Sequence, residues 1–167
     1  MIINAQLIEE IHNIPWFNEL TSLQVERLAG IAYLKTAVLG EELFKEGDRP
    51  DFLYVILEGE VILENYIPSI GKHFLARAEP LDVVGWSSLT PVVRQRSVTA
   101  RVCQLSHLLV IQAEALFRLC EEDHDLGFLV MRRISNIVAS HYLNSRLHLY
   151  QLIQNSAAPS LSQSNLI

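Results

Sequence analysis

The chain has 167 residues, of which 50% are apolar, and its mean hydropathy is +0.21. This length is enough to bury a core without disulfides or a structural metal. Its 13 basic side chains face 19 acidic ones, which speaks against a free-standing nucleic-acid binder. The N-terminus carries no signal-peptide pattern, and no apolar run approaches the about 20 residues that cross a bilayer. We therefore expect a cytoplasmic protein without membrane association.

The first part of the chain, residues 5–32, has a helical pattern of apolar side chains. Residues 15–17, Pro-Trp-Phe, interrupt the pattern, and Thr21 then offers an N-cap for a second helix that ends near Gly30. We expect two N-terminal helices.

The middle of the chain, residues 33–112, changes to alternation of apolar and polar side chains. Short strands without intervening helices favour an antiparallel sandwich or barrel over a parallel sheet with crossover helices. The alternating stretches are residues 41–44, 51–66, 72–80, 81–86 and 97–112.

The helical pattern returns in residues 113–153, as a short helix followed by a long one from about residue 125. The long helix has apolar side chains on two faces, which is more than one small barrel covers, so we expect a homodimer through this helix. One stripe is Leu126, Val130, Ile134, Ile137 and His141, and the other is Met131, Val138, Tyr142, Ser145 and Leu149. Residues 154–167 lack periodicity and are predicted to be a disordered tail beyond a single domain of residues 1–153.

Two groups of residues in the middle of the chain carry a family resemblance. They are Leu43, Phe44, Gly47 and Asp48, followed by Asp51, Tyr54, Ile56, Gly59 and Val61. With the order of elements, they make residues 15–150 resemble the cyclic nucleotide-binding domain of Crp/Fnr-type regulators and of cyclic-nucleotide-dependent kinases and channels. The resemblance implies an α+β fold, in which N-terminal helices and a long C-terminal dimerisation helix flank an antiparallel β-roll or jelly roll (a double-stranded β-helix).

The ligand-binding segment of that family is a phosphate-binding cassette, in which an Arg follows a Gly by about eleven residues. Gly85 and Arg96 have this spacing here. The resemblance implies that Arg96 binds the phosphate through charge-assisted hydrogen bonds. Ser97 is implied to add a hydroxyl or amide contact, and Ser87 and Ser88 are either ligand contacts or caps of a short helix.

The ribose half of the cassette departs from the family pattern. The family's ribose-binding Glu is replaced by Trp86, whose indole donates a hydrogen bond but accepts none. One missing buried partner costs on the order of 1–3 kcal/mol. Trp86 is therefore interpreted either as a pocket-filling residue or as an aromatic platform for a flat ligand, and we expect weak cAMP binding.

The long helix would supply the residue that covers the base in this family. Ser140, His141 and Asn144 are the polar candidates on or beside its apolar stripe. His124, among acidic neighbours, is interpreted as part of a solvated loop rather than as a metal ligand. Cys103 and Cys120 form no CxxC pair and are interpreted as reduced, packed thiols.

Catalysis and direct DNA binding are not expected. No nucleophile elbow, phosphate-binding loop or zinc-protease signature occurs, and no basic recognition helix follows the long helix. Two hypotheses stay open. One is a sensor that binds a small anionic ligand, with cAMP or cGMP as candidates and no required cofactor. The other is a degenerate, ligand-free dimer whose surface engages another protein.

Overall fold

The structure is a computed structural model that describes residues 5–90 and 92–157. The chain divides into two compact units, Met1–Leu129 and Val130–Ile167, and each is described by itself. The first unit holds every strand and the shorter helices. The second holds most of the long helix.

The N-terminal helices follow the predicted pattern. They are α1 (Ala5–Asn13), the 3-10 turn η1 (Pro15–Phe17) and α2 (Ser22–Ala29). Thr21 is the N-cap of α2, as predicted, and it forms a reciprocal capping box with Gln24. Gly30 then caps the C-terminal end of the helix.

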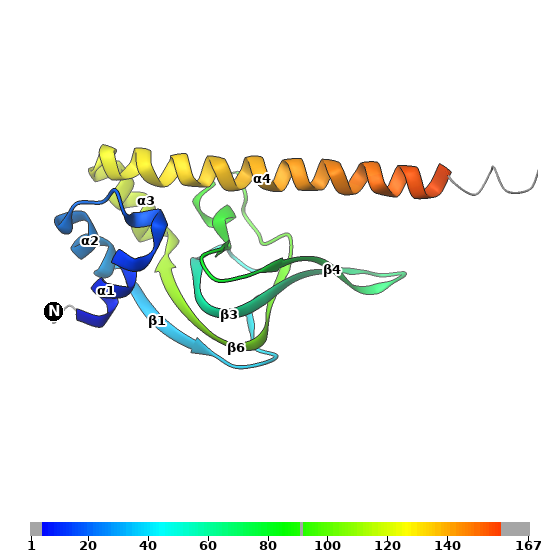
Figure 1. Ribbon diagram of the computed structural model, residues 1–167, viewed down its shortest axis with the longest axis horizontal. Coiled ribbons are helices and arrows are strands. Elements are labelled where there is room, and N and C mark those ends of the chain that lie inside the picture. Colours follow the sequence, from blue (N-terminus) through cyan, green and yellow to red (C-terminus); the bar gives the residue numbers. More distant parts are fainter. Residues whose placement is uncertain (1–4, 91, 158–167) are drawn as a thin grey trace, which may run out of the picture. The chain divides into compact units, whose positions relative to one another are not determined.

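A six-stranded antiparallel sheet forms the body of the first unit (Figure 1). Its main strand order is β1-β6-β3-β4, while β2 pairs with β6 and β5 pairs with β3. This sheet is the predicted antiparallel β-roll. The strands are β1 (Ala32–Ala37), β2 (Glu42–Phe44), β3 (Phe52–Ile67), β4 (Gly71–Ala78), β5 (Val83–Val84) and β6 (Thr99–Gln112).

The long strand β3 lies between β6 and β4 and changes partners along its length. It pairs with β6 from Phe52 to Glu64, whereas its pairing with β4 runs from Val61 to Ile67. Register shifts interrupt the β6 pairing around Gly59, which has a φ of +93°. Bulges and glycines of this kind bend strands enough to close a roll.

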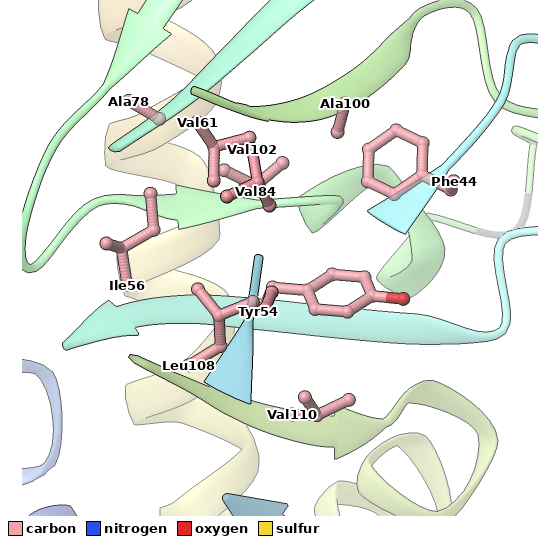
Figure 2. Close-up of a cluster of buried hydrophobic side chains, with 11 residues drawn as sticks. Phe44, Tyr54, Ile56, Val61, Ala78, Val84, Ala100, Val102, Leu108 and Val110 are labelled. Atoms are coloured by element: carbon pink, nitrogen blue, oxygen red, sulfur yellow. The ribbon is translucent and has the colours of Figure 1, made fainter. Parts of the chain in front are cut away.

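The core of the roll consists of side chains that point inward from several strands (Figure 2). Phe44 and Tyr54 form the aromatic part of this cluster, with ring centroids 6.0 Å apart. Because strands alternate their side chains, the inward positions of β3 and β6 are almost all apolar. The other members are Ala37, Ile56, Val61, Ala78, Val84, Ala100, Val102, Leu108 and Val110.

Two helices follow the roll, α3 (Ala113–Glu122) and α4 (His124–Ala157). Asp123 separates them and caps α4, because its Oδ1 accepts from the amide of Leu126 at 3.0 Å. Gln24 of α2 donates to the same carboxylate at 3.0 Å. The helix α4 extends four residues past the predicted end at residue 153, and residues 158–167 of the predicted tail lie outside the described residues. No described helix has the length and apolarity needed to cross a membrane.

Candidate functional site

The site begins at Gly85, which connects β5 to the 3-10 turn η2 (Trp86–Leu89). Its φ of +80° lies in the left-handed region that favours glycine. A Cβ atom at this position would lie 3.0 Å from both Nη1 of Arg96 and the carbonyl oxygen of Phe52. The backbone conformation and the close approach of Arg96 both require glycine here.

The backbone of Arg96 is held by the turn between β2 and β3. Its amide donates to the carbonyl of Asp48, and its carbonyl accepts from the amide of Gly47, both at 2.8 Å. Asp48 also closes its own turn, since its carboxylate accepts from the amide of Lys45 at 2.7 Å. These backbone hydrogen bonds hold Arg96 in place independently of its side-chain contacts.

The side chain of Arg96 points into the protein, and the residue is only 3% exposed. Nη1 donates to the carbonyl of Gly85 at 2.9 Å, and Nη2 donates to the carbonyl of Phe52. Ser87 Oγ lies 3.4 Å from Nη1, and the guanidinium carbon lies 4.3 Å from the centre of the Phe44 ring. The guanidinium therefore joins the start of β3 to the turn before η2.

The charge of Arg96 is only partly compensated in the described part of the chain. The groups that accept from it are neutral, its Nε has no hydrogen-bond partner, and no described carboxylate lies within ion-pair distance. Burial lowers the pKa of Arg96, although Tyr54, Asp51 and Asp48 act in the opposite direction. A buried cation without a paired anion is costly, so a negatively charged ligand would be stabilised beside it.

Arg96 lines a hollow of about 320 Å³. Burial raises the pKa of Tyr54 in its wall to about 12, and the Tyr54 hydroxyl donates to the carbonyl of Leu43 at 3.1 Å. The residues that line the hollow are Leu43, Phe44, Asp48, Arg49, Asp51, Phe52, Tyr54 and Arg96. Trp86, half-buried on η2, is not among them.

The predicted cassette residues divide into two groups. Gly85, Ser87 and Arg96 lie together, as their contacts show, and the Ser88 hydroxyl donates to the carbonyl of Gly85 at 2.8 Å. Ser88 thus stabilises the turn in the manner of a cap. Ser97 is exposed, and the hydrogen bonds of the Arg96 guanidinium in the described residues go to Gly85, Ser87 and Phe52 instead.

The predicted base-covering residues lie in the second unit. Ser140, His141 and Asn144 are exposed on α4, where their spacing of three and four residues sets them on one face. Their role toward a ligand stays a prediction.

Several residues around Arg96 were not predicted to belong to the site. Phe44, Asp48, Asp51 and Tyr54 were read only as turn and strand residues of the scaffold. One signal could have identified them: they lie at or near the Gly47-Asp48 turn in the sequence. That turn holds the backbone of Arg96. The carbonyl of Phe52 carries no side-chain signature and could not have been found this way.

Cys103 and Cys120 are free thiols, and burial raises the pKa of each to about 11. No group of His, Cys, Asp or Glu in residues 5–90 and 92–157 has the arrangement of a metal site.

Comparison with known protein families agrees with the resemblance found in the sequence. The family model for the cyclic nucleotide-binding domain matches residues 35–123, just over half of the chain. A search of curated protein sequences found no match.

Solved structures share the fold. A putative cyclic nucleotide-binding protein from Geobacter metallireducens is 25% identical with a TM-score of 0.71, covering 80% of this chain and 96% of that one. A cyclic nucleotide-binding domain from Methylobacillus flagellatus is 24% identical with a TM-score of 0.71, covering 93% and 85%. The regulatory domain of Toxoplasma gondii PKA, solved with cAMP, is 12% identical with a TM-score of 0.64, covering 78% and 49%.

Proposed function

The chain belongs to the cyclic nucleotide-binding domain family, and from this premise we propose that it is a non-catalytic regulatory domain in which Arg96 binds the anionic group of a small ligand. The supporting observation is the buried guanidinium of Arg96, whose described partners are neutral and whose Nε is unpartnered. An anion in the adjoining hollow would supply the missing negative charge.

The ligand class is a small molecule with a phosphate or similar anion, and cAMP and cGMP are the candidates to test. One structural relative of low identity was solved with cAMP. Trp86 stands where the family has a Glu that accepts from the ribose, and an indole accepts no hydrogen bond. The affinity of the native chain for cAMP is therefore weak, and no metal or further cofactor is required.

Calorimetry with cAMP and cGMP tests this proposal. Trp86→Glu restores the acceptor and strengthens cAMP binding at least about tenfold over the native chain, whereas Trp86→Gln, which has no charge, gains less. Arg96→Lys in the Trp86→Glu background weakens binding again, because lysine lacks the bidentate fork. The matched control is Arg94→Lys, at an exposed position two residues away.

Two results would contradict the proposal. Sub-micromolar cAMP binding by the native chain would show that Trp86 does not impair the ribose contact. Equal binding by Arg96→Lys and Arg94→Lys would show that Arg96 does not bind the anion.

The alternative function is a ligand-free interaction module, and one observation favours it. The carbonyls of Gly85 and Phe52 and the Ser87 hydroxyl already accept from the guanidinium, so the fold does not need a ligand to hold Arg96 in place. Under this alternative Trp86→Glu gains no nucleotide affinity. The calorimetric experiment therefore separates the two functions.

If the ligand is a nucleotide, Ser140, His141 and Asn144 of α4 are proposed to cover its base. His141→Ala then lowers the affinity of the Trp86→Glu variant for cAMP but not for inorganic phosphate, since phosphate has no base. An equal loss for both ligands would contradict a base-covering role.

We also propose that the protein is a cytoplasmic homodimer that pairs through α4 and does not contact DNA directly. Val138, Tyr142 and Leu149 recur at heptad spacing on α4 and remain exposed, at 39%, 61% and 55%. Sedimentation is expected to report twice the 18.9 kDa of one chain.

A substitution within the stripe tests this pairing. Tyr142→Asp dissociates the dimer because it places a charge in the seam. Leu143→Asp, at an exposed position outside the stripe, is the matched control. A native monomer at micromolar concentration, or an equal effect of the two variants, would contradict the arrangement.

A further inference from the structure

The hairpin of β3 and β4 extends beyond the rest of the sheet (Figure 1). The pairing of β3 with β6 ends at Glu64, whereas its pairing with β4 continues to Ile67 and Gly71. Residues 65–73 thus form a two-stranded ribbon, defined here as the β3–β4 ribbon. Such a ribbon is marginally stable by itself in water, and β4 is also the last strand of the sheet order.

Large apolar side chains are exposed on the β3–β4 ribbon and at its base. Tyr66 is 64% exposed, Ile70 69% and Phe74 53%. Phe74 lies on the edge strand β4, and an exposed edge with apolar side chains on or beside it is a template for another extended segment unless something protects it. Folding of this chain alone therefore leaves both apolar surface and an open strand edge at the same place.

The charges of β4 are all of one sign. Between Gly71 and Ala78 the strand contains the cations Lys72 and Arg77 and no acidic residue, although the whole chain has a net charge of −6. Lys72 is 59% exposed and Arg77 53%, and their partners on β3, Glu64 and Glu60, are far less exposed. The cations are thus the outer members of these pairs.

The pairing register of β3 and β4 places Lys72 and Arg77 on the same face of the sheet as the aromatic ring of Phe74. Lys72 pairs with Tyr66, Phe74 with Glu64 and Arg77 with Ile62, and the bulge at residue 75 accounts for the extra residue. Because residues 62, 64 and 66 share one face of β3, their partners on β4 share that face too. We call Lys72, Phe74 and Arg77 the cationic strip.

We propose that the free edge of β4 binds an extended acidic segment of another protein, which adds to the sheet as a further antiparallel strand. Its carboxylates would face Lys72 and Arg77, and an apolar side chain between them would cover Phe74. This rests on β4 and not on the function proposed for Arg96. A second copy of β4 fits poorly, because full-length antiparallel pairing sets Lys72 opposite Arg77, and opposed like charges destabilise a strand pair.

Fluorescence anisotropy with labelled peptides tests the proposal. The probe is TETVTET, which presents two glutamates and a valine on one face, and it is compared with TKTVTKT. The native protein is expected to bind TETVTET saturably and at least about tenfold more tightly than TKTVTKT. A version of TETVTET with N-methylated alternate amides loses binding, because it can no longer pair with a strand edge.

A charge exchange guards against a variant that merely misfolds. Lys72→Glu with Arg77→Glu is expected to reverse the preference, so that TKTVTKT binds better than TETVTET. Arg94→Glu with Arg118→Glu carries the same change of net charge at exposed positions outside the strip and keeps the native preference.

Three results would overturn the proposal. Undiminished binding of the N-methylated peptide would mean that charge alone attracts the probe. Unchanged preference in Lys72→Glu with Arg77→Glu would place the interaction elsewhere. A native dimer that this double variant converts to monomers would assign the strip to a second copy.

Discussion

Arg96 and Arg101 lie five residues apart, Arg96 in the loop before β6 and Arg101 within that strand, and their surroundings differ in charge. Arg101 donates to the carboxylates of Glu42 and Glu64 at 2.7 and 2.6 Å. Arg96 donates to main-chain carbonyls and stacks on Phe44. The first guanidinium is neutralised by acidic side chains of the same chain, whereas the charge of the second is only partly compensated.

The charge of the surrounding groups separates a structural arginine from a candidate ligand-binding one. Arg101 gains little from an added anion, because its side chain is only 23% exposed and two carboxylates, those of Glu42 and Glu64, already bind it and would have to be displaced. Arg96 has neutral partners, which an anion can replace with a gain in electrostatic energy, and both arginines border a hollow. A bordering hollow does not distinguish the two residues, but the charge of their partners does.

The largest effect is expected from Gly85→Ala, which forces a Cβ atom against the guanidinium of Arg96. Left-handed strain and the close contacts at 3.0 Å together cost about 3 kcal/mol in the free energy of unfolding. Gly40→Ala is the control, since Gly40 has a φ of +87° but open space around it, and it costs about 1 kcal/mol. Urea denaturation measures both, and equal losses would show that Arg96 does not press on Gly85.

The next largest effect is the loss of stability when each of the two arginines is replaced by methionine. Arg101→Met leaves Glu64 with Lys72 alone and lowers the unfolding free energy by about 2 kcal/mol. Arg96→Met costs less, because the lost hydrogen bonds are partly offset by removal of a buried unpaired charge. Greater destabilisation by Arg96→Met would contradict the assignment of Arg101 as the structural member.

The difference in unfolding free energy between the Arg101→Met variant and the native chain also depends on pH. Burial raises the pKa of Glu64, but hydrogen bonds and charges of Arg101 and Lys72 outweigh it and hold the pKa below 4.5. A depressed pKa contributes stability above 4.5 that is lost as the pH falls through the folded-state value. The difference in unfolding free energy between the two proteins therefore becomes smaller in acid. A difference that becomes larger below pH 4.5 would contradict this role of Glu64.

A smaller effect, this time a gain in stability, is expected from replacing Leu81, which precedes the Arg96 site in the chain. Its φ of +75° is strained for a side chain, and the residue is 47% exposed, so little packing is lost on its removal. Leu81→Gly raises the unfolding free energy by up to about 1 kcal/mol. Thermal unfolding that shifts downward in this variant would show that the exposed leucine stabilises the turn.

The last effect is on reactivity rather than on stability and concerns Cys103, whose thiol donates to Glu60, the carboxylate paired with Arg77. Burial comes first and the bond to Glu60 second in raising the pKa of this thiol to about 11. Alkylation by iodoacetamide at pH 8 is expected to be about a hundredfold slower than for an ordinary thiol. Ordinary rates at both cysteines would contradict the buried arrangement.

Much of the fold follows from local patterns in the sequence. Alternation located the strands, and Thr21 marked the start of α2 because capping depends only on neighbouring residues. The eleven-residue spacing brought Gly85 and Arg96 together correctly. The carbonyl partner on Phe52 was not predicted, because contacts to the main chain leave no trace in residue type. The helix α4 passes residue 153 because a polar composition does not by itself end a helix.

Anion binding by Arg96 is tested by following the Nε–H resonances of Arg96 and Arg101 by ¹H–¹⁵N NMR while cAMP is added to the Trp86→Glu variant. The Arg96 resonance is predicted to move saturably, because its Nε is unpartnered and a phosphate becomes its acceptor, while that of Arg101 stays in place. A stationary Arg96 resonance, or equal movement of both, would contradict the claim that Arg96 is the anion-binding residue.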